Sequence, residues 1–439
     1  MINNSHTKKS DVKTMKRSSV LALLLACTLL LAACGSTDAS ASAHCAVPLF
    51  PPLPEPEGLR IAVASDLHLN PENRPVSDER SASSYSLELV DALLRDVQNQ
   101  NADILLLTGD LCNSGKKHNH AALTGKLKQA EQSGLTVCVL PGNHDLAPVT
   151  QTGFAELYSE FGYAEAHSRD ESSLSYCAVR DDLMILMMDT AGYSIGSVDL
   201  PGAVTADSQN PHFSEGTIRW VEGMLKEAKA HNMRILAAGH YNLLPEISRD
   251  PDNARYYLVN GDLFSDLLKE YGVPLYLSGH IHTRAVYQEE GLTELVTEYL
   301  LSYPTGYSIL DLTDEGITYT PCRVDVDSWA AETGSSDPVL LSFTQWQQDE
   351  LQRYSVSNVE YMSERNPLSS KEKKQAAEFF YEVMNAYWKG TLSKDRGALK
   401  TMPGYSPFFR CSEGYAYGWW LKDLIDTASP LLEGFRISW

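Results

Sequence analysis

Five short apolar segments of this chain each end in residues that can bind a metal ion, and this recurrence constrains the fold more than any other feature. Short apolar runs bounded by turn residues are typical of buried strands. The segments and the motifs that follow them are Arg60–Ser65 with Asp66-Leu67-His68, Asp103–Thr108 with Gly109-Asp110, Leu135–Leu140 with Gly142-Asn143-His144-Asp145, Arg234–Ala238 with Gly239-His240, and Val273–Ser278 with Gly279-His280-Ile281-His282. Ligands of open α/β sheets bind beyond the carboxyl ends of the strands. The sequence therefore predicts one site at which the five loops converge.

Helical patterns and paired strands complete the predicted architecture. Leu87, Val90 and Leu94 lie on one face of a helical pattern, and Ser214 is placed as the N-cap of another. From Leu174 onward, apolar runs occur in pairs joined by turns. This mixture of βα units and strand pairs predicts an α/β sandwich, with sheets in the middle and helices outside.

The C-terminal part of the chain reads as a helical appendage over residues 335–439. Asp337 and Pro338 are typical of a helix start, and a second helix is expected from about Ser369 to Lys389, ending at Gly390. We therefore expect a body over 58–325 followed by a smaller helical domain.

The first 33 residues read as a bacterial lipoprotein signal peptide. Five basic residues and one acidic residue precede an apolar run from Val20 to Ala33, which is too short to span a roughly 30 Å hydrocarbon core comfortably. Cys34 follows a small-residue cleavage site and resembles the lipid-bearing cysteine of a lipobox; an ordinary signal peptide is the alternative. Residues 34–57 are proline-rich and predict an extended tether. We expect an exported protein, lipid-anchored through Cys34 to the outer face of a bacterial membrane.

Composition excludes two classes of protein. With 43% apolar residues the chain is not disordered, and with a net charge of −21 it lacks a broad basic face for duplex nucleic acid. That charge divides into +4 for the first 33 residues and −25 for the rest. No Cys-x-x-Cys motif occurs, and the sequence does not choose among buried thiols and isolated disulfides for six cysteines. These are Cys45, Cys112, Cys138, Cys177, Cys322 and Cys411.

The five motifs, in this order, resemble the pattern of the calcineurin-like metallophosphoesterase family from roughly Leu59 to Thr320. The resemblance implies a four-layer αββα sandwich and two divalent metal ions that share one aspartate. Carried over position by position, the first ion would be bound by Asp66, His68, Asp110 and His282, and the second by Asp110, Asn143, His240 and His280. Imidazole, carboxylate and amide ligands suit Mn, Fe or Zn better than Ca or Mg.

The resemblance also implies roles in catalysis. His144 would protonate the leaving oxygen or stabilise the transition state, and Asp145 would orient His144. Asn113 is expected either to touch the substrate phosphate or to stabilise a turn, and Arg284 is a weaker candidate for a phosphate contact.

Within the family, the motifs look most like the class III cyclic nucleotide phosphodiesterase branch. This implies hydrolysis of small phosphodiesters, including 3′,5′-cyclic nucleotides, by hydroxide activated between two metal ions. A phosphomonoesterase, nucleotidase or lipid phosphoesterase on the same fold is the alternative. A non-catalytic metal-binding scaffold is a further one, although such relatives typically lack a ligand or the histidine that here is His144.

Overall fold

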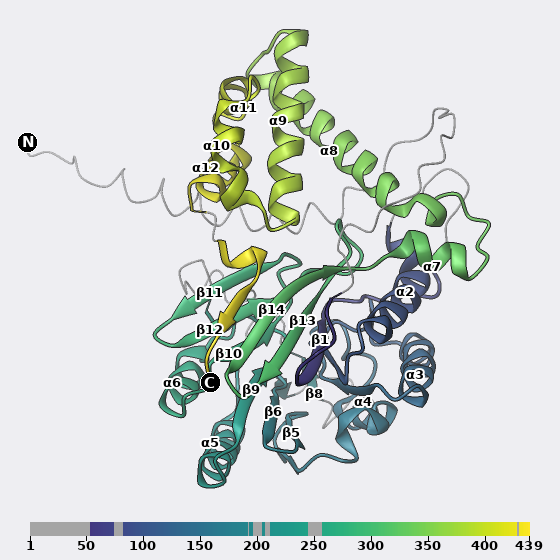
Figure 1. Cartoon of the computed structure of the whole chain (residues 1–439), viewed down its shortest axis with the longest axis vertical. Helices are drawn as coiled ribbons and strands as arrows, with labels where there is room; N and C mark the ends of the chain where they lie inside the picture. The colour runs from purple at the N-terminus through teal and green to yellow at the C-terminus, as the bar shows by residue number, and fades with distance from the viewer. Residues whose placement is uncertain are drawn as a thin grey trace, which may run out of the picture. The chain divides into compact units, whose positions relative to one another are not determined.

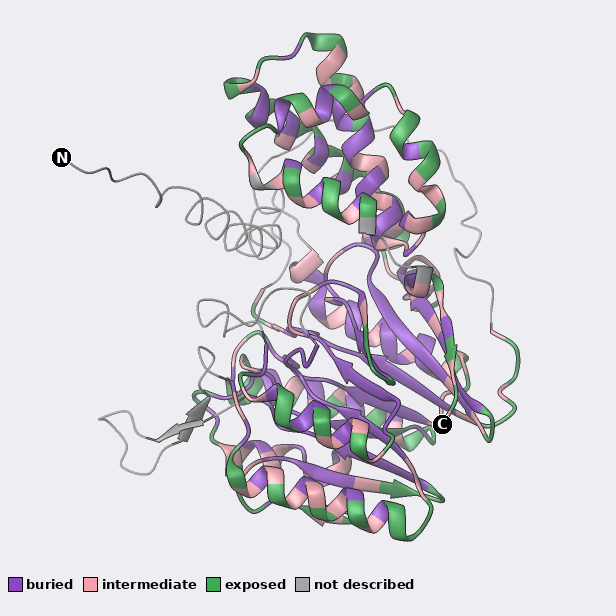
Figure 2. Ribbon diagram, turned by 90° about the vertical axis from the view of Figure 1, so that its left-hand side faces the viewer, coloured by how far each residue is buried: buried purple, intermediate pink, exposed green. Residues whose placement is uncertain are grey.

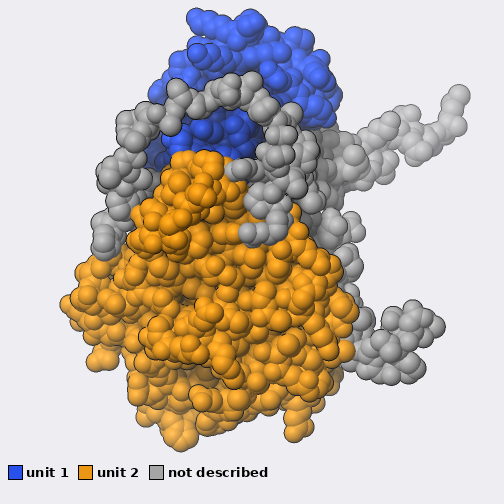
Figure 3. All heavy atoms as spheres, turned by 90° about the vertical axis from the view of Figure 1, so that its right-hand side faces the viewer, with its two compact units in different colours: residues 1–33, 345–430 blue, residues 34–344, 431–439 orange. Residues whose placement is uncertain are grey.

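The computed structural model describes residues 53–73, 82–191, 193–195, 204–206, 211–244, 257–427 and 430–439. The expected signal peptide, Cys34, Cys45 and most of the tether lie outside these residues. The described residues form two compact units, coloured separately in Figure 3: one contains Gln345–Pro430, and the other contains the described residues within 53–344 together with Leu431–Trp439.

The first sheet of the larger unit has the strand order β15-β14-β13-β1-β2-β3. Its strands are β1 (Leu59–Ala64), β2 (Ile104–Leu107), β3 (Thr136–Val139), β13 (Gly306–Thr313), β14 (Gly316–Arg323) and β15 (Phe435–Ile437). The neighbours β1, β2 and β3 are parallel, whereas β13, β14 and β15 add antiparallel pairs on the other side of β1. The carboxyl ends of β1, β2 and β3 therefore meet at one edge.

The second sheet has the order β11-β12-β10-β9-β6-β5-β4 and a parallel centre. Its strands are β4 (Ser168–Arg169), β5 (Tyr176–Arg180), β6 (Leu183–Met187), β9 (Arg234–Ala238), β10 (Leu275–Ser278), β11 (Ala285–Glu289) and β12 (Leu292–Val296). A separate antiparallel pair consists of β7 (Tyr193–Ile195) and β8 (Val204–Ala206).

The two sheets lie against each other, with helices outside them (Figure 1). The Tyr176 hydroxyl of β5 donates to the Val139 carbonyl of β3 at 3.0 Å, and Arg234 of β9 donates to the Thr313 carbonyl of β13 at 3.1 Å. The helices of this unit are α2 (Ser86–Asn99), α3 (Lys117–Gln132), α4 (Gln151–Leu157), α5 (Glu215–Ala230), α6 (Gly261–Glu270) and α7 (Val326–Glu332), with short helical turns at Ala82–Tyr85, Ser159–Tyr163 and Leu340–Ser342. The predicted α/β sandwich is confirmed.

Apolar patterning explains where these elements pack. The Ser214 hydroxyl caps α5 by accepting from the Thr217 N–H, and the helix buries Val221 and Leu225 against the second sheet. Figure 2 shows the strands buried almost throughout, whereas the outer helices alternate between buried and exposed positions. The core therefore holds the strands, and with them their carboxyl ends, in fixed positions.

The smaller unit is helical. It contains most of α8 (Phe343–Arg365), and α9 (Ser370–Trp388), α10 (Leu392–Thr401), α11 (Tyr405–Cys411) and α12 (Ala416–Thr427). Ser369 and Glu372 form a capping box at the start of α9, and Gly390 adopts a φ of 78° beyond its end.

The boundary differs from the expected appendage over 335–439 at both ends. The helical unit begins at Gln345, and the last nine residues return to the larger unit. There, after a short helical turn at Pro430–Glu433, β15 pairs with β14. A strand of three residues carries too little pattern to be recognised in sequence.

Two further properties concern the described residues alone. Cys112, Cys138, Cys177, Cys322 and Cys411 are all buried free thiols. No helix in the described part of the chain is both long and apolar enough to cross a membrane.

Candidate metal centre

The predicted ligands lie on loops that leave β1, β2, β3, β9 and β10 at one edge of the paired sheets. Five of these side chains project from residues with left-handed backbone, which is uncommon outside glycine and costs about 1–3 kcal/mol each. They are Asp66 (φ 53°), His68 (φ 40°), Asp110 (φ 49°), His280 (φ 70°) and His282 (φ 58°). Strained backbone gathered in this way is typical of a functional site.

Two glycines, Gly109 and Gly142, lie where the ligand loops approach one another closely. A Cβ atom on Gly142 would lie 2.2 Å from Asp110 Oδ1, and one on Gly109 would lie 2.7 Å from the His240 ring. Neither position has room for a side chain, so the glycines allow the loops to meet.

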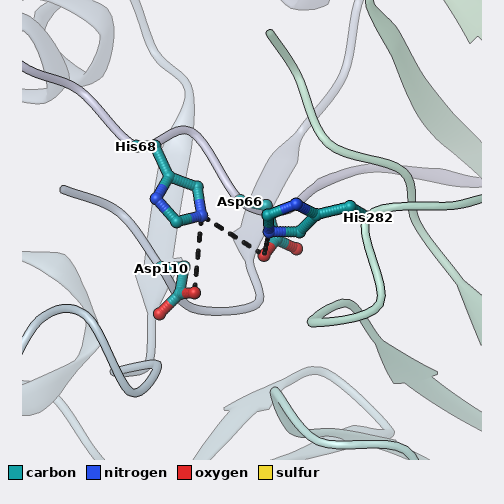
Figure 4. A group of neighbouring side chains, drawn as sticks. All are labelled: Asp66, His68, Asp110 and His282. Atoms are coloured by element: carbon teal, nitrogen blue, oxygen red, sulfur yellow. Dashed lines mark ion pairs between the residues drawn. The ribbon is translucent and has the colours of Figure 1, made fainter. Parts of the chain in front are cut away.

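The first group of predicted ligands is drawn in Figure 4. His68 Nε2 lies 3.4 Å from Asp110 Oδ2 and 3.7 Å from Asp66 Oδ1, and His282 Nε2 lies 3.3 Å from the same Asp66 oxygen. The carboxylates and imidazoles thus point toward one small volume.

The second group shares Asp110 with the first. His240 Nε2 lies 3.3 Å from Asp110 Oδ2 and 3.2 Å from the Asn143 side-chain oxygen. The ligand atoms of Asp110, His240 and His280 all lie within 4.8 Å of one another. The structure therefore brings all seven predicted ligands together around Asp110.

Hydrogen bonds from outside the groups fix which ligand atoms face inward. The Thr108 carbonyl lies 2.9 Å from His240 Nδ1, so this nitrogen carries the proton and Nε2 is left for a ligand. Asp110 Oδ1 accepts from the His144 N–H at 2.8 Å, which leaves Oδ2 for the imidazoles. Asp66 Oδ2 accepts from the Ser65 hydroxyl and the His280 N–H, leaving Oδ1 free to face His68 and His282.

The residues fit a pair of divalent ions. Among the described side chains, Asp66 Oδ1 and His68 Nε2 are buried without a hydrogen-bond partner, although buried polar atoms ordinarily have one. Both atoms face the centre of the first group, where a cation would satisfy them. The donor set of imidazole nitrogens, carboxylates and one amide oxygen is that of a transition-metal site.

Electrostatics favour positive charge at this centre. Burial alone would raise the pKa of Asp110, but the charge of His240 and its hydrogen bond outweigh burial and hold that pKa well below its usual range. Burial would lower the pKa of His240, but Asp110 raises it to about 9. The pKa of Asp66 also lies well below its usual range, because the neighbouring His282 and His68 imidazoles outweigh its burial. The buried carboxylates therefore stabilise cationic partners between them.

His144 lies at the rim of the centre, with a side chain that is 43% exposed. Its Nε2 is 4.0 Å from Asp110 Oδ2, and its ring lies 4.7 Å from that of His68. The Asn113 carbonyl lies 3.1 Å from His144 Nδ1 and orients the ring. The Asn113 residue itself is exposed on the loop, beside the centre.

Asp145 does not have the expected role. Its buried carboxylate accepts from the N–H groups of Leu111, Cys112 and Gly142 at 2.9–3.0 Å. It therefore ties the Asp110 loop to the Asn143 loop rather than orienting the His144 ring. Burial raises the pKa of Asp145 to about 7, and the nearby Asp110 charge contributes to that rise.

Arg284 is likewise not placed to contact a substrate phosphate. Its side chain is 3% exposed and forms an ion pair with Glu298, so the guanidinium binds a carboxylate in the interior and does not face solvent. Only Thr283 separates Arg284 from His282 in sequence, but the Arg284 side chain, directly before β11, is buried in the interior.

In a third cluster of side chains that could bind a metal ion, the histidine nitrogens already contact other groups of the protein. The possible ligand atoms of Cys112, His120 and Asp145 lie within 4.8 Å of one another. However, His120 Nδ1 contacts the Tyr158 hydroxyl at 2.8 Å, and its Nε2 contacts the Asp145 carbonyl at 3.1 Å. Burial lowers the pKa of His120 to about 4, so this imidazole is uncharged and packs in the interior behind the metal centre.

Two tyrosines that sequence reasoning missed support the paired histidines. The Tyr299 ring stacks on His282, with 4.4 Å between centroids and 13° between planes. Tyr241 lies against His280, with 4.0 Å between centroids. Because Tyr241 directly follows His240, its position near the site could be predicted from the sequence. Nothing in the sequence marks Tyr299 as a neighbour of the site.

Comparisons with known proteins agree with this geometry. A family model described as calcineurin-like phosphoesterase matches residues 59–284, and one described as the C-terminal domain of cyclic nucleotide phosphodiesterase matches residues 325–427. A Fibrobacter succinogenes protein described as a probable cyclic nucleotide phosphodiesterase is 27% identical over 100 residues, which are 23% of this chain and 36% of that protein. The match thus spans about a third of the curated relative.

Solved structures of similar fold were also found. A dimetal phosphatase from Danio rerio is 12% identical with a TM-score of 0.45, and the alignment covers 61% of this chain and 96% of that one. A purple acid phosphatase from yellow lupin (Lupinus luteus) seeds is 13% identical with a TM-score of 0.39, covering 63% of this chain and 53% of that one.

Proposed function

The chain belongs to the calcineurin-like phosphoesterase family, and on that premise we propose that it is a phosphodiesterase that uses two divalent metal ions and accepts 3′,5′-cyclic nucleotides. The observation that carries the proposal is the position of Asp110, whose Oδ2 faces His68 of one ligand group and His240 of the other. A carboxylate shared in this way is what a two-ion site requires.

The proposed site assigns a place to each ligand. Asp66, His68, Asp110 and His282 would hold one ion. Asp110, Asn143, His240 and His280 would hold the other. When bound, the ions would neutralise the phosphate charge and act as Lewis acids on it.

The chain's own residues would orient the reaction and move a proton. The Asn113 carbonyl requires a proton on His144 Nδ1, so that Nε2 faces the centre. In the proposed mechanism, protonated Nε2 gives its proton to the oxygen that leaves the phosphorus atom. Burial of Asp66 and Asp110 excludes bulk water from the floor of the site and strengthens their interaction with cations.

The proposed preference for a cyclic nucleotide is supported by the comparisons with known proteins rather than by the metal-binding residues. Phosphomonoesterases and phosphodiesterases on this fold share the same metal-binding motifs. The C-terminal match over residues 325–427 and the short match to the Fibrobacter protein both favour the cyclic nucleotide branch.

A substrate panel tests this function. Apoprotein supplied separately with Mn²⁺, Fe²⁺ or Zn²⁺ is assayed with bis-p-nitrophenyl phosphate, p-nitrophenyl phosphate, 3′,5′-cyclic AMP and 2′,3′-cyclic AMP. We expect hydrolysis of the aryl diester and of the 3′,5′-cyclic nucleotide, and none after the ions are chelated. Strong monoesterase activity without diesterase activity would instead identify a phosphomonoesterase.

We also propose that the protein is a lipoprotein held at the outer face of a bacterial membrane. The support is the basic and apolar start of the chain followed by Leu31-Ala32-Ala33-Cys34. Expressed in a bacterial host with labelled palmitate, the wild-type protein is expected to carry label and to sediment with membranes. Cys34→Ala is expected to abolish both, whereas Cys27→Ala, inside the apolar run, is expected to keep them. Label that survives Cys34→Ala would contradict the proposal.

A further inference from the structure

We propose that Glu294, together with Thr190, is a positioning device for the second group of metal ligands. Neither residue belongs to a recognisable motif, and both are fully buried. They hold the loop His240–Leu244, which leaves β9 and carries one ligand of that group. This inference rests on the proposed two-ion site.

The start of the loop is held from one side by Thr190. Its hydroxyl oxygen accepts from the N–H groups of His240 and Tyr241, both at 3.0 Å. Thr190 follows β6, which is the parallel neighbour of β9 in the second sheet. The backbone at His240 is therefore fixed to the adjacent strand end.

The rest of the loop is held from the other side by Glu294 of β12. Its carboxylate accepts from the Leu243 N–H at 3.0 Å, from the Leu244 N–H, and from the Asn242 side-chain amide at 3.2 Å. Four backbone N–H groups of one loop are thus satisfied by two buried side chains, one that follows β6 and one on β12. A loop bonded in this way has little freedom to move its ligand.

Glu294 also reaches the strand that carries the other histidine of the second group. The Ser278 hydroxyl donates to Glu294 at 2.6 Å, and Ser278 ends β10 two residues before His280. The Gly279 N–H donates to the His240 carbonyl at 3.0 Å, which joins the two loops directly. One carboxylate therefore sets the positions of both loops.

The first group depends less on Glu294, because His282 is its one ligand on the loop after β10 that also carries His280. Asp66 and His68 follow β1 in the other sheet, and His282 stacks on Tyr299. Loss of the Glu294 carboxylate should therefore weaken binding of one ion much more than the other. A merely structural role would lower thermal stability and leave the ratio of the two affinities unchanged.

The test compares metal binding by full-length variants. Glu294→Gln keeps the size of the side chain but turns an N–H donor toward groups that themselves donate. Thr190→Val removes the hydroxyl at nearly constant volume, and Thr190→Ser restores it. Asp170→Asn is the matched control, because Asp170 is 7% exposed and accepts from Ser172, Ser173 and Thr217, none of which belongs to a ligand loop.

Apoprotein is titrated with Mn²⁺ by calorimetry and examined by electron paramagnetic resonance. The wild type is expected to bind two ions and to give a spin-coupled spectrum. In Glu294→Gln and Thr190→Val we expect one ion to bind as in the wild type and the other about 10–100-fold more weakly, with a mononuclear spectrum at limiting metal. Thr190→Ser and Asp170→Asn are expected to behave as the wild type.

The outcomes separate this inference from the proposed function. A wild-type protein that binds fewer than two ions would overturn the proposed function and this inference with it. Two wild-type ions with equal weakening of both, or no weakening, in the variants would overturn only the positioning role. If Glu294→Gln does not fold, the comparison of Thr190→Val with Thr190→Ser decides the question.

Discussion

At the scale of single residues, Asp110 is the ligand on which both groups of the metal centre depend. It is 1% exposed, its backbone is left-handed, and its two oxygens have different duties. Oδ1 accepts from the His144 N–H, whereas Oδ2 faces His68 and His240. A carboxylate can accept a hydrogen bond with one oxygen, face both ligand groups with the other, and still supply negative charge to two cations.

Asp110→Asn is therefore expected to abolish turnover of bis-p-nitrophenyl phosphate and to weaken the binding of both ions. The loss of affinity should exceed the roughly 10–100-fold that is typical when a residue hydrogen-bonded to a metal ligand is replaced. The amide keeps the volume, so the circular dichroism spectrum should stay that of the wild type. Asp314→Asn, at an exposed position, serves as the control. Turnover near the wild-type rate in Asp110→Asn would rule out the shared-aspartate site.

His144 is expected to matter for the leaving group rather than for metal binding, since it belongs to neither ligand group. His144→Gln should lower kcat by roughly 10²–10⁴-fold for a substrate with an alkoxide leaving group such as a cyclic nucleotide. The loss should be much smaller for p-nitrophenolate, which leaves without a proton. Metal content measured by mass spectrometry should stay at the wild-type value. An equal loss for both leaving groups would contradict the role of proton donor.

Residue identities at the centre were predictable where a motif marked them. Asp66, His68 and His240 stand beside predicted strand ends, so topology alone brought them together. Side chains that arrive from distant strands, such as Glu294 and Tyr299, have no such marker. Asp145 and Arg284 were assigned wrong roles, because sequence proximity to a ligand does not say which way a buried side chain faces.

At the scale of elements, the site depends on loops that approach more closely than side chains normally permit. Gly142→Ala would place a Cβ atom 2.2 Å from Asp110 Oδ1, so the Asp110 carboxylate or the loop must shift. We expect a destabilisation of about 1–3 kcal/mol together with weaker metal binding.

Gly125→Ala is a matched control for that variant. Gly125 lies inside α3, and a Cβ there would meet nothing within 4 Å. This substitution should stabilise the protein by up to about 1 kcal/mol, because alanine is the better helix former. Urea unfolding and metal titration of the two variants measure the contrast; unchanged metal affinity in Gly142→Ala would show that the loops can separate without harm to the site.

The elements of the larger unit were largely predictable because their apolar runs are long and bounded by turns. The expected segment Arg234–Ala238 coincides with β9, and Ser214 caps α5 as its sequence indicates. Strand order, in contrast, depends on pairings between residues far apart in the chain, such as Leu59 with Leu312, and no local pattern encodes them.

At the scale of the whole molecule, the chain leaves the larger unit after Thr344 and returns to it at Leu431. The returning segment is anchored by apolar and polar contacts alike. Phe435 lies against Tyr319 with 4.9 Å between ring centroids, and Trp439 donates to the Thr313 carbonyl at 2.7 Å. The last strand thus covers the edge of β14, which would otherwise present unpaired backbone groups.

Phe435→Ala is expected to destabilise the larger unit by about 3 kcal/mol, because it removes a large side chain that is only 9% exposed. The metal centre lies at the ends of other strands, so ion affinities and kcat at 20 °C should remain those of the wild type while the Tm falls. Arg436, the next residue along β15, has an exposed side chain that forms an ion pair with the exposed Glu315, so Arg436→Ala should leave the Tm unchanged. If the terminal strand were a mere extension of the helical unit, Phe435→Ala and Arg436→Ala would give the same Tm. A fall confined to Phe435→Ala would show that this short strand closes the first sheet.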